Sequence, residues 1–120
     1  MEKKTLVLGA SLKTDRYSNY VIHKLIERSN EVVAIGLKTG HVAGVEIKTE
    51  LSHISGIDTV TLYLNPLRQK SYYQYIIDLN PRRVIFNPGT ENPELYDLLE
   101  EANIEAEVAC TLVLLSTNQY

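Results

Sequence analysis

The sequence predicts an α/β fold with an open, doubly wound and mostly parallel sheet of five strands, with helices on both faces. Five short apolar runs, most of them rich in β-branched residues, are each bounded by turn residues. Segments with the period of a helix lie between most of these runs. A helix between two strands supplies the crossover that parallel pairing needs, and such crossovers are right-handed in nearly all proteins.

The five expected strands follow the apolar runs. They are TLVLG (residues 5–9), EVVAIG (31–36), DTVTLYL (58–64), RVIFN (83–87) and AEVA (106–109). The glycine-rich stretch 37–57 has no clear period, and we expect it to supply a loop, a short strand and one helical turn.

The first expected helix covers residues 18–29, where apolar side chains recur on one face. A second helix follows the third strand, because Asn65 is a suitable cap and Pro66 a suitable first residue. The Asn80-Pro81 pair ends that pattern. Residues 110–115 are apolar enough for a short closing helix.

The third expected helix repeats the capping arrangement of the second. Asn92 is the expected cap, and Pro93 the first helical residue. The apolar face contains Leu95, Leu98, Leu99 and Ala102.

Length and composition predict a single globular domain over residues 1–120. Hydrophobic residues make up 44% and charged residues 22% of the chain. The net charge is −3 and the Lys and Arg residues are scattered, so we expect no nucleic-acid partner. We find no signal peptide and no apolar run that could span a membrane. We therefore expect a soluble, cytoplasmic protein without a membrane partner, and the single Cys110 excludes an internal disulfide.

The loop after the first strand is the most specific segment of the chain. In an open α/β sheet, ligands bind beyond the carboxyl ends of the strands, where the strand order reverses. The helix that follows offers unpaired amides and the positive end of its dipole. Ser11, Lys13, Arg16 and Ser18 add hydroxyls and cations, which suit a phosphorylated nucleotide. In the alternative interpretation the cations are solvated, and Ser18 or Asp15 only caps the helix.

Two common nucleotide motifs are missing from this loop. The G-x-G-x-x-G fingerprint needs glycines at positions 9, 11 and 14, but only Gly9 is present. The second strand ends in Gly36-Leu37-Lys38 where an acidic ribose-binding residue is usual, and Lys38 is better suited to another phosphate. The Walker pattern is absent as well. An NAD(P)-binding protein is therefore the least favoured alternative.

Residues 9–18 match the pattern G-x-S-x-K-x-x-R-x-S at all five defined positions, and this pattern resembles the CoA-binding family of small Rossmann-like proteins. That family is related to the nucleotide domain of succinyl-CoA synthetase. The resemblance extends from about Lys4 to Thr111. Its further matches are Gly44, Gly89 and Asn92 in FNPGTEN, and Cys110 after the last strand.

The resemblance implies a ligand, coenzyme A (CoA) or an acyl-CoA, and its placement. The pyrophosphate would lie over residues 9–13, which include Gly9, Ala10 and Ser11, with Arg16 and Ser18 near phosphate. The adenosine would lie toward Gly36 and Lys38, and the loop 87–92, with Gly89 and Asn92, could close the other side. One departure is Ile35-Gly36-Leu37, where the family usually has Val-Asn-Pro.

We therefore expect a nucleotide-binding protein that is not an enzyme. No motif places a histidine to activate Cys110, and His23, His41 and His53 lack metal-ligand spacing, so neither a catalytic nor a metal site is predicted. The alternative is a protein-interaction or regulatory module whose nucleotide site has degenerated, as the Ile35-Gly36-Leu37 departure suggests. Tyr72, Tyr73 and Tyr75 are expected to cover the sheet, and packing of this helix against a second subunit in a homodimer is the other interpretation.

Overall fold

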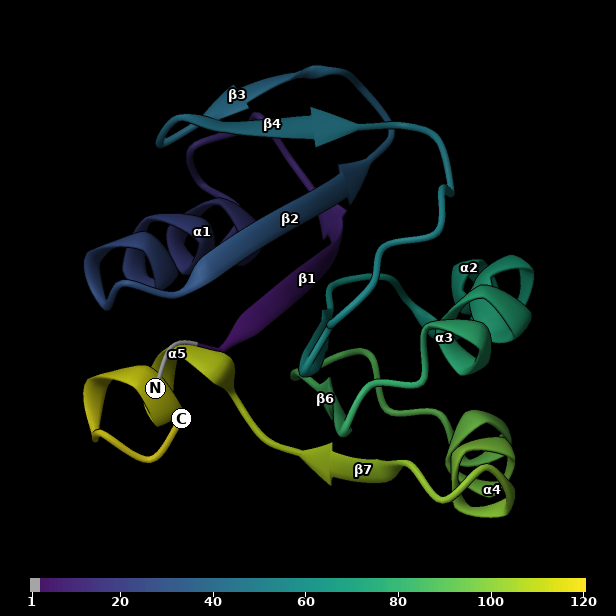
Figure 1. The fold of residues 1–120 in the computed structure, drawn as a ribbon. Helices are drawn as coiled ribbons and strands as arrows, with labels where there is room; N and C mark the ends of the chain where they lie inside the picture. The colour runs from purple at the N-terminus through teal and green to yellow at the C-terminus, as the bar shows by residue number, and fades with distance from the viewer. Residues whose placement is uncertain (1–2) are drawn as a thin grey trace.

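The computed structural model describes residues 3–120 and contains a seven-stranded sheet in the order β3-β4-β2-β1-β5-β6-β7 (Figure 1). The strands are β1 (Lys4–Ala10), β2 (Glu31–Gly36), β3 (Gly40–Val42), β4 (Val45–Lys48), β5 (Thr59–Leu62), β6 (Arg83–Phe86) and β7 (Glu105–Val108). Every neighbouring pair is parallel except β3 and β4. The α/β class and the mostly parallel sheet are confirmed.

The predicted count of five strands is wrong, because the stretch 37–57 forms a β3–β4 hairpin and no helical turn. The hairpin turn consists of Ala43 and Gly44, both with positive φ. Hairpin turns of this kind are usually marked by Asn-Gly or Asp-Gly, and Ala-Gly gives no such signal. The hairpin extends the sheet because β4 pairs with β2, and it buries Ile47 and Val42.

The helices occupy the segments that the sequence predicts. They are α1 (Tyr17–Glu27), α2 (Pro66–Gln69), the 3-10 turn η1 (Lys70–Tyr72), α3 (Tyr73–Leu79), α4 (Pro93–Glu101) and α5 (Thr111–Ser116). The capping predictions are confirmed, since the Asn65 side chain accepts from the Arg68 N–H and the Asn92 side chain from the Leu95 N–H.

The second predicted helix is divided into α2, η1 and α3. Gln69 lies at the end of α2 with its side chain buried, and its amide donates to the carbonyls of Leu64 and Thr90 at 2.8 Å each. Tyr72, the last residue of η1, has φ −106° and ψ −4°, well away from the dihedral angles of a regular α-helix. Asn80 then ends α3 in the left-handed conformation, as the Asn80-Pro81 signal predicts.

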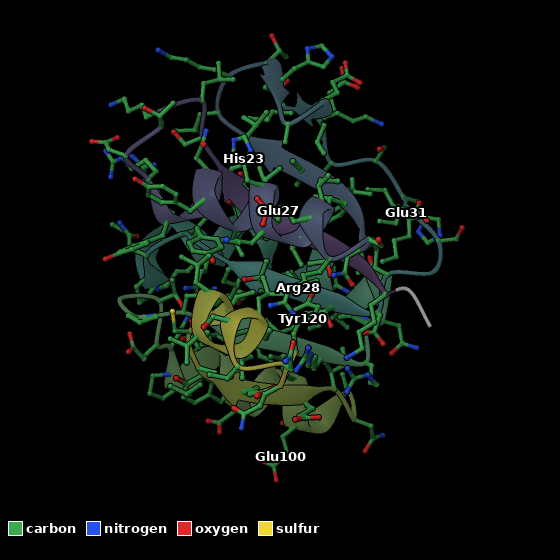
Figure 2. The ribbon with its side chains drawn as sticks, turned by 90° about the vertical axis from the view of Figure 1, so that its left-hand side faces the viewer. His23, Glu27, Arg28, Glu31, Glu100 and Tyr120 are labelled. Atoms are coloured by element: carbon green, nitrogen blue, oxygen red, sulfur yellow. The ribbon has the colours of Figure 1, made fainter. Side chains whose placement is uncertain are left out.

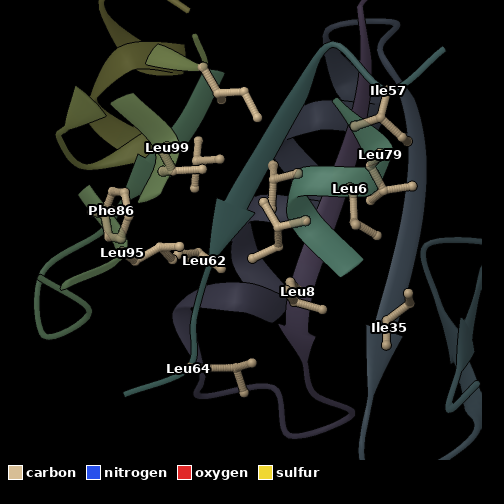
Figure 3. Packing of buried hydrophobic residues seen from close by; sticks show 14 residues of the cluster. Leu6, Leu8, Ile35, Ile57, Leu62, Leu64, Leu79, Phe86, Leu95 and Leu99 are labelled. Atoms are coloured by element: carbon tan, nitrogen blue, oxygen red, sulfur yellow. The ribbon is translucent and has the colours of Figure 1, made fainter. Parts of the chain in front are cut away.

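Helices cover both faces of the sheet (Figure 1). Helices α1 and α5 contact one another on one face, over a core that includes Val7, Ile22 and Ile47. Helices α2, α3 and α4 lie on the other face. The core on this face joins leucines of β1, β5 and α4 to Phe86 (Figure 3). The half-buried side chains of Tyr72, Tyr73 and Tyr75 pack against this core.

The strand order reverses beside β1, which lies between β2 and β5. Two glycines allow close packing at the carboxyl ends of these strands. A Cβ on Gly9, whose φ is +97°, would lie 2.9 Å from the Tyr63 backbone carbon. A Cβ on Gly36 would lie 2.2 Å from the Ala10 carbonyl oxygen. The packing of β1 against β2 therefore explains why residue 36 is glycine.

Tyr120 covers the amino ends of β1 and β6. The Tyr120 ring lies 4.8 Å from the Arg83 guanidinium carbon, and its hydroxyl contacts Thr5. Burial raises the pKa of the Tyr120 hydroxyl. Figure 2 shows the face of the molecule that carries Arg28 and Tyr120, and the Arg28 guanidinium donates to the Asn118 side chain. This end of the sheet is therefore filled by side chains of the chain itself.

Candidate functional site

A cavity of about 630 Å³ opens at the carboxyl ends of β1, β2 and β5, beside the strand-order reversal. Most of the residues that line it come from the β1–α1 loop, the end of β2 and the segment after β5. They are Gly9, Ala10, Ser11, Leu12, Lys13, Arg16, Ser18, Gly36, Leu37, Lys38, Tyr63, Leu64, Arg68 and Tyr72. The structure thus brings together eight of the ten predicted site residues.

The β1–α1 loop is held in shape by hydrogen bonds within itself and with α1. The Ser11 hydroxyl accepts from the Lys13 N–H at 3.1 Å, and the Lys13 carbonyl accepts from the Arg16 N–H at 3.2 Å. Asn19, which is buried, donates from its side chain to the Ser11 carbonyl at 3.0 Å. The loop is therefore ordered before any ligand arrives, which lowers the entropic cost of binding.

The start of α1 faces this cavity without a side-chain cap. Arg16 is the N-cap residue, its backbone is extended, and no side chain accepts from the first helical amides. The alternative in which Ser18 or Asp15 caps the helix is therefore wrong. Ser18 is only 3% exposed and lines the cavity. A helix start of this kind favours an anion, since its free amides carry partial positive charge.

The cavity wall carries four cations and no carboxylate. The cations are Lys13, Arg16, Lys38 and Arg68. Within residues 3–120, none of the four forms an ion pair. The chain as a whole has a net charge of −3, so the positive potential is local to this cavity. Low-dielectric walls with charge of one sign attract ligands of the opposite sign.

Sequence reasoning missed Arg68, Tyr63 and Tyr72, which come from the segment after β5 and from the helices α2 and η1. Arg68 lies in the first turn of α2, three residues after the cap Asn65. The signal was available: a capped helix after a central strand starts at the same edge of the sheet as α1. Tyr63 is half-buried, and burial of its hydroxyl raises the pKa of that group well above its ordinary value.

Gly89 and Asn92 do not line this cavity. The Gly89 N–H donates to the Glu91 carboxylate at 2.8 Å. Asn92 is buried, and its amide donates to the Gln69 side-chain oxygen at 2.9 Å and to the Tyr73 hydroxyl at 2.8 Å. Asn92 therefore braces α2, which carries Arg68. Direct contact of Gly89 or Asn92 with a ligand stays a prediction.

The other candidate groups lie apart from the cavity wall. Cys110 is half-buried at the start of α5 and is not among the lining residues. The residues from 3 to 120 contain no group of three or more His, Cys, Asp or Glu side chains that could hold a metal ion.

Comparison with known proteins identifies the family. Residues 3–116 match the family model described as "CoA binding domain". The chain belongs to the CoA binding domain family. The family assignment made from residues 9–18 is confirmed, and the match spans nearly the whole chain.

Solved structures share the fold of this CoA binding domain. A crystal structure of an uncharacterised protein is 48% identical, with a TM-score of 0.97, and the match covers 100% of this chain and 99% of the other. A protein from Thermus thermophilus is 22% identical, with a TM-score of 0.88 and coverages of 99% and 91%. A hypothetical protein from Pyrococcus horikoshii OT3 is 27% identical, with a TM-score of 0.82 and coverages of 93% and 80%. No curated protein matches.

Among the helices that the structure describes, none combines the length and the apolar composition required to cross a bilayer.

Proposed function

We propose that this chain binds CoA, or an acyl-CoA, in the cavity at the carboxyl ends of β1, β2 and β5, and performs no chemistry of its own. The observation that carries the proposal is the cavity wall: four cations, no carboxylate and an uncapped helix start meet at the strand-order reversal. Membership of the CoA binding domain family supports this ligand over other nucleotides.

The pyrophosphate is assigned to the β1–α1 loop and the start of α1. There the amides of the first helical turn, the Ser18 side chain and the Lys13 and Arg16 cations surround one part of the cavity. Phosphate oxygens accept hydrogen bonds from amides and from cations, and the contacts with cations are the stronger ones. This placement leaves Lys38 and Arg68 for the other anionic parts of the ligand.

Lys38 is assigned to the 3′-phosphate of the CoA ribose. It follows the end of β2, where dinucleotide-binding proteins usually have an acidic residue for the ribose hydroxyls. A cation at this place favours a phosphorylated ribose over a free one. Leu37, which lines the cavity and is 70% exposed, offers apolar contact to the adenine.

The composition of the wall supports binding without catalysis. The lining contains no histidine, cysteine or carboxylate, and its hydroxyl and amino groups other than the tyrosines are those of Ser11, Ser18, Lys13 and Lys38. Its tyrosines are Tyr63 and Tyr72, and burial raises the pKa of Tyr63 further from neutrality. Within residues 3–120, the hydroxyls of Ser11 and Ser18 form no hydrogen bond to a side chain that could act as their base, which supports binding without catalysis.

Calorimetry with CoA, dephospho-CoA and ADP tests the proposal. We expect CoA to bind more tightly than the other two ligands. The variant Arg16→Ala should weaken binding, whereas the control Lys24→Ala, which removes an exposed cation further along α1, should not. Absence of heat for all three ligands at millimolar protein would overturn the proposal and favour the interaction module with a degenerate site. Tight NADH binding in a fluorescence titration would restore the NAD(P) alternative.

A further inference from the structure

The sheet ends at β7, whose outer edge has no partner strand in residues 3–120. The N–H groups of Glu105 and Ala109 donate inward to carbonyls of Arg82 and Phe86. Because backbone groups alternate along a strand, the N–H and C=O of Ala106 and Val108 point outward. In Figure 1, β7 is the outermost strand at this end of the sheet, with α4 to one side.

An apolar groove of about 320 Å³ lies along this edge, between α4 and β7. It is lined by Tyr96, Glu100, Ile104, Ala106 and Val108. Val108 is 60% exposed, whereas all four residues of β5 and of β6 are buried. Side chains on one face of an added strand would therefore enter the groove and cover Val108.

The charge around the edge is acidic. Helix α4 and strand β7, which form the edge, carry six carboxylates and no Lys, Arg or His, and the cations beside them are Arg82 and Arg83 of the neighbouring strand segment. Glu107 is paired with Arg83 at 2.8 Å, and Glu105 lies 4.0 Å from Arg82. Glu100 lines the groove and is exposed, and Figure 2 shows it pointing away from the body of the protein. Within residues 3–120, the carboxylates of α4 form no ion pair, so positive charge on a partner strand beside the groove is favourable.

We propose that the outer edge of β7 docks an extended segment of another protein in which apolar residues alternate with Lys or Arg. The segment adds as an eighth strand, its backbone pairing with the outward groups of Ala106 and Val108. Its apolar side chains enter the groove, and its cations lie beside Glu105 and Glu107 on the other face. Cations at the ends of the segment meet Glu100.

A second copy of the chain fits this edge less well than a basic segment does. Pairing β7 with β7 places Glu105 and Glu107 of each copy on one face of the joined sheet, and like charges on adjacent strands are destabilising. Charged residues on an edge strand generally oppose such self-pairing. The surface is also separate from the proposed CoA cavity, since no residue lines both.

The test uses a fluorescein-labelled nine-residue peptide that alternates lysine and valine, titrated with the full chain and followed by anisotropy. The control peptide alternates glutamate and valine. We expect the lysine peptide to bind and to shift the amide resonances of Ala106 and Val108. The variant Ala106→Pro removes an outward N–H that β6 does not use, and should weaken binding at least tenfold.

A charge-reversal variant keeps the test independent of any effect of proline on folding. Glu100→Lys changes an exposed side chain, and it should weaken the lysine peptide and strengthen the glutamate peptide. Val113→Lys, at an exposed position on α5, serves as the control for added charge. Absence of binding at millimolar protein, equal binding of both peptides, or resonance shifts elsewhere than β7 and α4 would overturn the proposal.

Discussion

Replacing Asn92 with alanine tests whether this residue stabilises the position of α2 or contacts the ligand. The Asn92 side chain accepts from the Leu95 N–H and donates to Gln69 and Tyr73. Loss of an N-cap costs roughly 0.5–2 kcal/mol. The Gln69 side-chain oxygen, buried in α2, loses its donor, which costs about 1–3 kcal/mol more.

We therefore expect Asn92→Ala to lower the free energy of unfolding by about 1.5–5 kcal/mol. Urea denaturation followed by circular dichroism measures this change. CoA affinity should be measured under conditions in which both proteins are folded. It should fall only modestly, because a loosened α2 affects Arg68 but not the other three cations of the cavity. A variant of unchanged stability whose CoA affinity falls tenfold would show that Asn92 contacts the ligand, and would refute the bracing role.

Three further changes test the site and the fold. Arg16→Ala should weaken CoA binding by about 1.5–3 kcal/mol, roughly tenfold to 150-fold, because a charge-assisted hydrogen bond to phosphate is lost. If calorimetry shows unchanged affinity, Arg16 does not belong to the site. Lys38→Ala should weaken CoA but leave dephospho-CoA nearly unchanged, and equal losses for the two ligands would contradict its assignment to the 3′-phosphate. Burial alone would raise the pKa of Asp58, but hydrogen bonds from Arg82 and Thr59 outweigh it and leave that pKa below its usual range. The stability that this carboxyl contributes is therefore present above its pKa in the unfolded chain and is lost as the pH falls through its pKa in the folded protein. Asp58→Asn should thus make the free energy of unfolding depend less steeply on pH below about pH 4. An unchanged slope in denaturation measured from pH 2 to 6 would contradict this prediction.

Local signals in the sequence were sufficient for the central strands and most helix boundaries. Strands β1, β2, β5 and β6 are short apolar runs; β1, β5 and β6 are largely buried, and β2 is buried at Ala34 and Ile35. The two asparagine caps fixed the starts of α2 and α4 because an Asn-Pro pair suits the N-cap and first helical positions.

The β3–β4 hairpin could not be predicted in the same way. Its turn places Ala43 in a conformation that alanine rarely adopts, and the stability comes from burying Val42 and Ile47 against the rest of the sheet. The break after α2 is also tertiary in origin, because the Gln69 side chain bonds to Leu64 and Thr90, which lie outside the helix.

The β1–α1 loop of the site could be located from sequence because one continuous segment, residues 9–18, provides most of its groups. Arg68 lies outside that segment and was missed, although its helix cap Asn65 gave a signal for it. Tyr72 lies in η1, where the sequence predicted one continuous helix. Asn92 was proposed from a family motif as a ligand contact, and this stays a prediction; its side chain also holds α2 in position through Gln69.

A crystal structure of the chain grown with excess CoA tests the central claim most directly. The account predicts pyrophosphate oxygens within hydrogen-bond distance of the first amides of α1, with Lys13 and Arg16 turned toward them. CoA absent from this loop, or bound with Lys13 and Arg16 pointing into bulk water, would contradict the account.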